Sequence, residues 1–146
     1  MRTEWETNGV AWLRPGALFT AVLIPASVIH VAVGLPGPKE CAPHIAEVLD
    51  EGPVFFQRGG FGPDDTYTAL LPAGAARYWF MSRTVVHTPH ALLLVPAPDV
   101  REPAETGPWW VVPLEGPGLL CPADRLAALV GFGLSRTGRA RGALDA

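Results

Sequence analysis

The pattern of apolar and polar positions is dominated by 24 residues, Pro15 to Pro38, that carry no formal charge when His30 is counted as neutral. A membrane-spanning helix needs about 20 apolar residues, so the run is long enough for one. Pro25 lies near its middle, disfavours helix at the residue before it and suits the first turn of a new helix. The run therefore predicts a buried strand over 18–24 followed by a short helix that ends at Gly34, and no membrane span.

Further along the chain, short apolar segments alternate with Gly and Pro, which predicts many short elements joined by tight turns. Pro43 opens a predicted second helix, which Gly52 ends. Segments 54–56 and 66–71 predict a hairpin with a long glycine-rich loop. Later apolar segments lie at 77–81, at 85–86, at 91–95 (the expected central strand) and at 109–112 (the expected last strand). A final helix begins at Pro122, and Gly131 and Gly133 weaken its C-terminal end.

Sheet and helix segments without a repeat or a domain break indicate one α+β domain over residues 1–135. We expect a two-layer sandwich with a mostly antiparallel sheet and helices on one face. A chain of 146 residues is long enough to bury roughly two thirds of its unfolded surface. Residues 136–146, with Arg136, Arg139 and Arg141, predict a flexible basic C-terminal tail.

Composition narrows the classes of function. The net charge is −3 and Lys39 is the single lysine, which argues against general nucleic-acid affinity. Cys41 and Cys121 lie far apart outside any CxxC spacing, which fits a reducing cytosol. The N-terminal segment has two acids and no apolar core after it, so we do not expect a secretory signal there, and a signal-like segment that starts at Arg14 stays open as an alternative. We therefore expect a cytoplasmic protein that does not associate with the membrane.

Candidate catalytic and metal-binding groups are few. The adjacent carboxylates Asp64 and Asp65 lie in a Gly/Pro turn, where Asp side chains usually accept hydrogen bonds from turn amides. His87 and His90 are three residues apart and resemble a zinc-ligand pair, but Pro89 breaks a helix there and a strand directs the two rings to opposite faces.

Other reactive groups lack the context that chemistry needs. No Gly-x-Ser-x-Gly or phosphate-binding glycine motif occurs in the chain. His30 and His44 have no evident partner, and Cys121 is interpreted as a structural thiol. We expect no cofactor and no bound metal.

Aromatic residues are the remaining signal. Trp109 and Trp110 are neighbours on a predicted strand and face opposite ways, so one of them is exposed unless another segment covers it. An exposed Trp is a frequent anchor of a protein interface. The alternative is that the terminal segment or the last helix packs over it.

Several short motifs suggest a relationship. They are Phe19-Thr-Ala-Val-Leu-Ile-Pro25, Glu47-Val-Leu-Asp-Glu-Gly-Pro-Val54, Tyr67-Thr-Ala-Leu-Leu-Pro-Ala-Gly74, Trp110-Val-Val-Pro113 and Leu120-Cys-Pro-Ala-Asp124. With them, residues 10–134 resemble a group of small, mostly uncharacterised actinobacterial proteins. That group is similar to the N-terminal domain of bifunctional DNA primase/polymerases, which has an RRM-like α/β fold.

The resemblance implies a lost activity. Catalytic members of that class hold divalent metal with two alternating carboxylates on a strand, a Ser-x-His and a further Asp. Here the matching strand, 19–24, contains no acid, and no Ser-x-His occurs. The resemblance therefore implies a pseudoenzyme or scaffold without metal binding or nucleotidyl transfer.

Three functions follow as hypotheses, in order of preference. The first is a non-catalytic domain that binds a protein partner or a second copy of itself. The second is a degenerate primase-like module that binds nucleotide or single-stranded nucleic acid through Arg77, Arg83 and a Trp stacking platform. The third is an enzyme centred on two histidines. The candidate interaction residues are Trp79, Trp109, Trp110, Arg77, Arg83, His87 and His90.

Overall fold

The computed structural model describes residues 10–13, 19–61, 64–87, 93–103, 107–113 and 120–145. Its strands are β1 (Val10–Leu13), β2 (Phe19–Pro25), β3 (Val54–Phe61), β4 (Asp64–Pro72), β5 (Val85–Val86), β6 (Leu93–Pro96) and β7 (Trp109–Val112). Its α-helices are α2 (Ala26–Val33), α3 (Pro38–Val48) and α4 (Ala123–Asp145), and a 3-10 helix, η1, spans Ala73–Tyr78.

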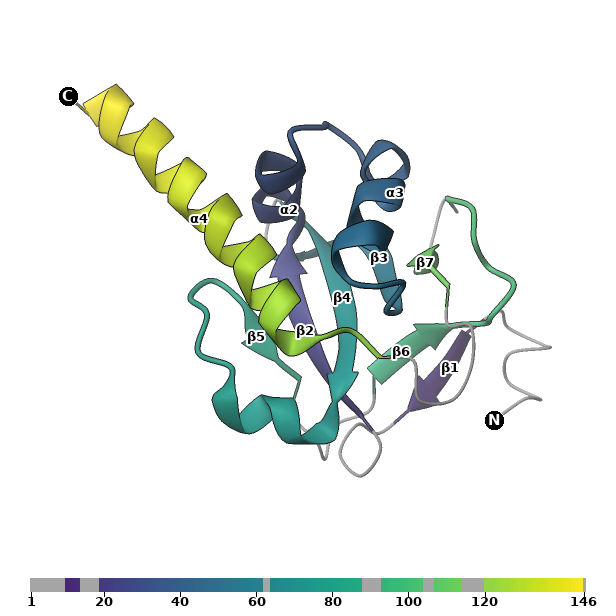
Figure 1. Ribbon diagram of the computed structural model, residues 1–146. Coiled ribbons are helices and arrows are strands. Elements are labelled where there is room, and N and C mark those ends of the chain that lie inside the picture. Colours follow the sequence, from purple (N-terminus) through teal and green to yellow (C-terminus); the bar gives the residue numbers. More distant parts are fainter. Residues whose placement is uncertain are drawn as a thin grey trace.

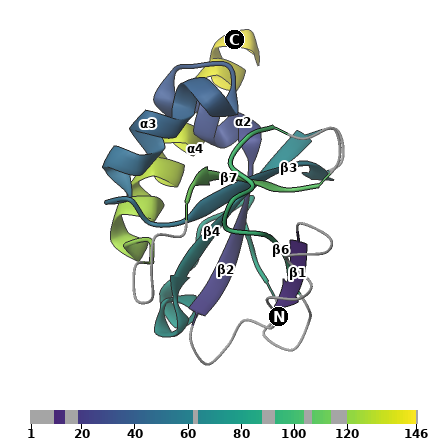
Figure 2. The ribbon, with the colours of Figure 1, turned by 90° about the vertical axis from the view of Figure 1, so that its right-hand side faces the viewer.

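Five strands form one antiparallel sheet in the order β5-β2-β4-β3-β7. Strands β2 and β3 run in the same direction, because each is antiparallel to β4, which lies between them. The connection from β2 to β3 carries α2 and α3, which makes this a split β-α-β unit. All three α-helices lie on one face of the sheet (Figures 1 and 2). The predicted α+β sandwich is confirmed.

The uncharged run forms a strand and a helix, as the sequence predicts. Pro25 is the last residue of β2, and α2 begins at the next residue. Gly34 ends α2 in the left-handed conformation, with φ of 84°, and its N–H donates to the carbonyl of His30 at 2.8 Å. Among the described residues, no helix has the length and apolarity required to cross a membrane.

The second helix begins earlier than predicted. Helix α3 starts at Pro38, a favourable N1 position, and Pro43 lies inside it. Cys41 and Ile45 are its buried residues, one turn apart, and they anchor the helix on both sides of the proline. The missing N–H of Pro43 therefore costs one early intrahelical hydrogen bond and does not define the helix start.

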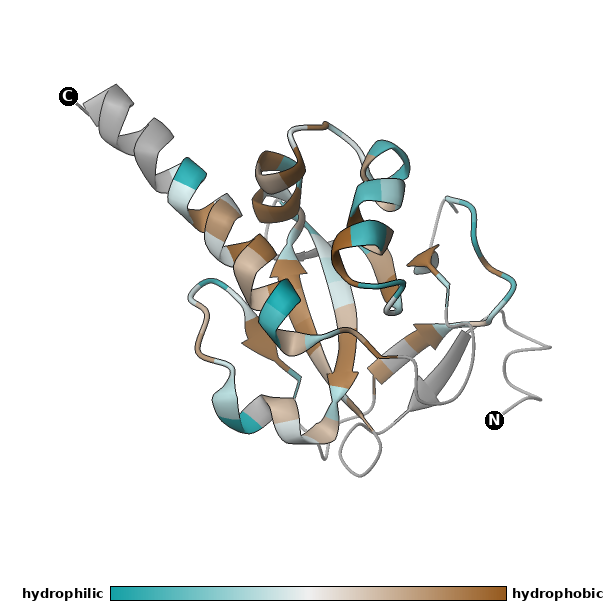
Figure 3. Cartoon of the chain, in the orientation of Figure 1, coloured by the Kyte–Doolittle hydropathy of each residue, from teal (hydrophilic) through white to brown (hydrophobic). Residues whose placement is uncertain are grey.

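Apolar side chains fill the space between the sheet and the helices. In Figure 3, α2 and β2 are apolar along most of their length, whereas α3 alternates polar and apolar residues. The central residues of this core come from β2, β4, α2, α3 and α4, and include Ile24, Leu71, Val28, Ile45 and Leu126.

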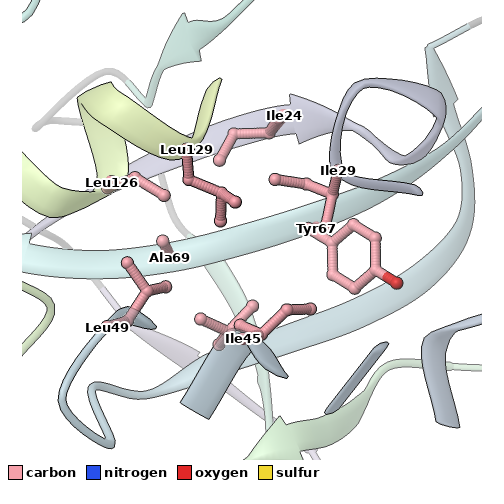
Figure 4. A pocket seen from close by; sticks show the side chains of 9 residues that line it. Ile24, Ile29, Ile45, Leu49, Tyr67, Ala69, Leu126 and Leu129 are labelled. Atoms are coloured by element: carbon pink, nitrogen blue, oxygen red, sulfur yellow. The ribbon is translucent and has the colours of Figure 1, made fainter. Parts of the chain in front are cut away.

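One small void remains inside this core, where α2, α3 and α4 meet over β4 (Figure 4). Its volume is about 10 Å³, room for one water molecule at most. The lining is aliphatic except for the ring of Tyr67, whose hydroxyl lies at the edge of the group (Figure 4). A dry apolar space of this size is a packing defect and not a ligand site.

A second, smaller core lies on the other face of the sheet. Strands β1 and β6 pair only with each other and form a separate two-stranded ribbon. Leu93 and Val95 of β6 pack against Phe55, Leu70 and Trp110 of the main sheet. The segment that the sequence predicted as the central strand is therefore part of this ribbon, and β4 is central instead. The ribbon itself was not predicted.

The last helix is longer than predicted. Helix α4 continues past Gly131 and Gly133 to Asp145, so the segment expected to be a tail is helical through residue 145. Its C-terminal half extends away from the sheet (Figure 1). Gly133 is buried at the crossing with α2, where a Cβ atom would overlap the carbonyl oxygen of Val28. This glycine permits a close approach of two helices and does not end one.

Candidate functional site

The tryptophans proposed as interface anchors are buried. Trp109 is 5 % exposed on the helix side of the sheet, and Trp110 is 1 % exposed on the ribbon side. The indole N–H of Trp110 donates to the carbonyl of Pro96 on β6 at 3.1 Å. The two rings do face opposite sides of the sheet, as predicted. The ribbon of β1 and β6 covers Trp110, and the sequence did not reveal this. Neither indole is available as an exposed anchor.

Trp79 is likewise buried, at 8 % exposure, and its N–H donates to the hydroxyl of Thr84 at 2.8 Å. Its neighbours are not. Tyr78 is 81 % exposed and Phe80 is 86 % exposed, the largest values among the exposed large apolar side chains of the described residues. The backbone is extended at Trp79, which directs successive side chains to opposite sides. Because Trp79 points into the core, Tyr78 and Phe80 point out.

The segment Arg77–Arg83, named here the aromatic loop, joins η1 to the edge strand β5. Both of its arginines are exposed. Arg83 adopts a left-handed backbone with φ of 62° and lines an open hollow with Pro25, Asp64 and Val85. Sequence reasoning selected the arginines and missed the two exposed rings. The available signal was the row of three aromatics, of which a strand-like backbone buries the middle one.

The carboxylates at the β3–β4 turn bind backbone and hydroxyl groups, as predicted. Asp64 accepts hydrogen bonds from the hydroxyl of Ser27 at 2.7 Å and from its N–H at 3.3 Å, at the first turn of α2. Asp65 accepts one from the N–H of Gly59 at 2.9 Å. These contacts fix the turn and the helix start.

The histidines proposed as zinc ligands are not brought together in what the structure describes. His87 is partly buried beyond β5, and its backbone N–H donates to the carbonyl of Ala21 at 2.8 Å. His90 lies outside the described residues. Within the described ranges, no group of three or more His, Cys, Asp or Glu residues has the arrangement to hold a metal ion.

A third histidine has the partner that the sequence did not reveal. The Nε2 atom of His30 on α2 lies 2.7 Å from the hydroxyl of Tyr67 on β4, and the two rings meet edge to face. Burial lowers the pKa of His30, and the negative charges of Asp64, Asp65 and Glu40 oppose this shift. Burial also raises the pKa of Tyr67 well above its usual value. The prediction that His30 is unpartnered is wrong.

This pairing predicts a pH dependence of stability. The folded-state pKa of His30 lies below its ordinary value of 6.5, so the unfolded chain takes up the proton first as the pH falls. The contribution of His30 to the free energy of unfolding is therefore fully present above pH 6.5 and declines as the pH falls toward the folded-state pKa. Urea unfolding between pH 7.5 and 5 is expected to show a free energy of unfolding that falls with pH, and His30→Gln is expected to make this fall smaller. The exposed His44→Gln serves as the control, and an equal slope in both variants contradicts the assignment.

A cleft opens at the end of the sheet near the start of α3. It is lined by Gly37, Pro38, Lys39, Glu40, Phe56, Arg58, Asp65, Pro103 and Trp109 and has a volume of about 470 Å³. It is named here the α3–β3 cleft. Phe56 packs against Tyr67 and Trp109, with ring centroids 5.1 and 5.9 Å apart, so the lining includes two aromatic rings in contact, those of Phe56 and Trp109.

Neither cysteine is activated. Burial raises the pKa of the Cys121 thiol to about 12, and its Sγ lies 3.4 Å from the carbonyl of Pro53. The Cys41 thiol is also buried, and burial raises its pKa. The interpretation of Cys121 as a structural thiol agrees with these values, and any lowering of its pKa by the dipole of α4 is outweighed.

Two features of the described surface are therefore candidates for binding a partner or a ligand: the exposed rings of the aromatic loop and the α3–β3 cleft. Comparison of the chain with protein-family models, with curated proteins and with solved structures found no match.

Proposed function

We propose that this chain is a non-catalytic cytoplasmic domain that acts by binding another protein through the aromatic loop. The observation that carries the proposal is the exposure of Tyr78 and Phe80, two adjacent outward rings on one short loop. Tyr and Phe each bury a large apolar area when a partner covers them, and aromatic residues are enriched at interface centres. Val85, half exposed on the neighbouring edge strand, extends the apolar surface.

The charge of the loop indicates the kind of partner. Arg77 and Arg83 flank the two rings, and the sequence from Thr66 to Pro98 contains no Asp or Glu. A protein surface that combines apolar side chains with carboxylates complements this arrangement, because the arginines then gain partners as the rings are covered. We therefore propose an acidic protein partner, and a second copy of the chain is an outcome that the test below distinguishes.

The non-catalytic part of the proposal rests on missing chemistry. Strand β2 contains no carboxylate, and both thiols are buried with raised pKa values. The relation to primase/polymerase domains stays a prediction, and it points the same way, since that relation implies a copy without its metal-binding acids.

Substitution of the two rings tests the proposal. Tyr78→Ser and Phe80→Ser are each expected to leave the free energy of unfolding within about 0.5 kcal/mol of wild type, because both side chains already face water. Each is expected to weaken association at least about tenfold, as the loss of an interface anchor does. Phe132→Ser, at a half-exposed aromatic position of α4, is the matched control and is expected to leave the association unchanged.

The association is measured by placing a photo-crosslinking residue at position 80 in cells and, as a control, at exposed Glu47 on α3. A discrete adduct from position 80, lost with Arg83→Glu, supports the proposal. The mass of the adduct shows whether the crosslinked partner is a second copy of the chain or a different protein. Light scattering of the purified chain checks for self-association. No adduct specific to position 80, or an adduct insensitive to the charge reversal, contradicts it.

A second candidate is the binding of single-stranded nucleic acid. The observation in its favour is that two arginines flank two exposed rings, the combination that stacking platforms use. The platform would be Tyr78 and Phe80, because the tryptophans named for that role are buried. Titration of a labelled oligonucleotide at low salt decides: saturable, salt-sensitive binding that Phe80→Ser abolishes replaces the protein-binding proposal, and a flat titration removes this candidate.

A further inference from the structure

We infer that the α3–β3 cleft is a binding site for a small molecule that carries one carboxylate on an apolar body. This site is separate from the aromatic loop and does not depend on the function proposed for that loop. Its volume of about 470 Å³ lies within the 300–1,000 Å³ that is usual for ligand pockets.

Trp109, one of the residues that line the cleft, carries an unused hydrogen-bond donor. Trp109 is almost fully buried, yet its indole N–H has no acceptor among the described residues. Among the described residues, every fully buried side-chain nitrogen or oxygen has a hydrogen-bond partner. Because the indole N–H of Trp109 has none, it is in contact with solvent. Trp109 lines the cleft, and the proposal places its N–H there. Trp79 and Trp110, by contrast, both donate to protein acceptors.

An unpaired cation also lines the cleft. Arg58 of β3 is exposed and forms no ion pair within the described residues, whereas Lys39 pairs with Glu102 across the rim. A guanidinium and an indole N–H together supply donors without acceptors. A carboxylate matches them, because it accepts several hydrogen bonds and binds Arg in a two-point geometry.

The acids that line the cleft define what it excludes. Asp65 also lines the cleft, and its Oδ1 atom accepts the N–H of Gly59. Glu40 folds back over Gly37 in the first turn of α3. With Lys39 and Arg58 the formal charge of the lining is zero. Glu40 and Asp65 supply two negative charges at this cleft, so a ligand with a single negative charge is accommodated beside Arg58 and a phosphate with two is repelled more strongly.

The remaining lining is apolar. Phe56, Trp109, Pro38 and Pro103 surround the polar groups, so the part of the ligand beyond its carboxylate meets rings and methylene groups. An aryl or short aliphatic acid fits this division between a polar wall and an apolar base.

The test uses phenylacetate as the probe, with phenylacetamide and phenyl phosphate as comparisons. Two-dimensional ¹H–¹⁵N NMR resolves the indole N–H signals, and Trp109→Phe assigns the relevant one. Phenylacetate is expected to shift this signal in a saturable way at millimolar concentration. Phenylacetamide lacks the charge that pairs with Arg58, and phenyl phosphate adds repulsion from the acids of the cleft. Each is therefore expected to bind at least about tenfold more weakly.

Arg58→Gln supplies the decisive variant, since the residue is exposed and its loss leaves the core intact. It is expected to weaken phenylacetate at least about tenfold. Arg77→Gln, the same change on the aromatic loop, leaves the affinity unchanged. The proposal is overturned if phenylacetate does not move the Trp109 signal saturably, if phenyl phosphate binds as tightly as phenylacetate, or if Arg58→Gln binds like wild type.

Discussion

Gly133→Ala is expected to lower the free energy of unfolding by about 2–3 kcal/mol, although alanine is the better helix former. The added Cβ would overlap the Val28 carbonyl oxygen and lie 2.9 Å from the Val28 Cγ1 atom. The carbonyl oxygen belongs to the backbone of α2, as does the Val28 carbonyl carbon at 3.1 Å, so no rotamer change relieves the overlap. Helices α2 and α4 must separate, and the shared core between them loosens.

Gly131→Ala is the matched control, two residues earlier on the same helix. A Cβ there meets only the terminal carbon of Met81, at an ordinary contact distance of 3.4 Å. We expect this variant to be neutral or to gain up to about 1 kcal/mol from helix propensity. Urea unfolding of the two variants measures the difference. Equal behaviour of both alanines contradicts the helix crossing described for Gly133.

Trp110→Ala is expected to lower the free energy of unfolding by about 3–5 kcal/mol, as removal of a fully buried aromatic side chain does. The ring packs edge to face on Phe55 with centroids 5.4 Å apart, and its N–H holds the carbonyl of Pro96. The substitution leaves a cavity between the sheet and the ribbon that neither layer is able to close alone.

Trp110→Phe separates the two contributions. It keeps an aromatic ring and loses the hydrogen bond, so we expect a smaller loss of about 1–3 kcal/mol. Tyr78→Ala removes an aromatic side chain of similar size from an exposed position and is expected to stay within about 0.5 kcal/mol of wild type. Chemical unfolding followed by circular dichroism ranks the three. A Trp110→Ala variant as stable as Tyr78→Ala contradicts the buried position.

Local signals predicted the local structure well. Pro25 and Gly34 mark the ends of α2 because proline and glycine act through the backbone dihedrals of one or two residues. The hairpin of β3 and β4 was predicted as well, but its long glycine-rich loop was not confirmed, because Arg58-Gly-Gly-Phe61 belongs to β3 and Asp64 begins β4. Pro43 misled the same reasoning, since a proline in the early part of a helix is compatible with continuation when the buried residues around it hold the helix in place.

The site depended on contacts between distant segments, which the sequence pattern does not contain. Whether Trp110 is exposed depends on β6, and the partner of His30 lies 37 positions away on β4. The exposure of Tyr78 and Phe80 follows from the orientation of Trp79 alone. Strand periodicity assigned Trp109 and Trp110 to opposite faces correctly, but only the tertiary structure decides what covers each face.

The ribbon of β1 and β6 has a consequence for the order of folding. It pairs residues that are 80 to 86 positions apart in the chain, from Leu13 with Leu93 to Val10 with Pro96. Closing so long a loop in an unfolded chain is entropically costly, whereas β3 and β4 are joined by a short turn and form early. We therefore expect the main sheet and its helices to assemble while the Trp110 face is still open to water. During that interval the chain exposes an apolar sheet surface that its finished structure conceals.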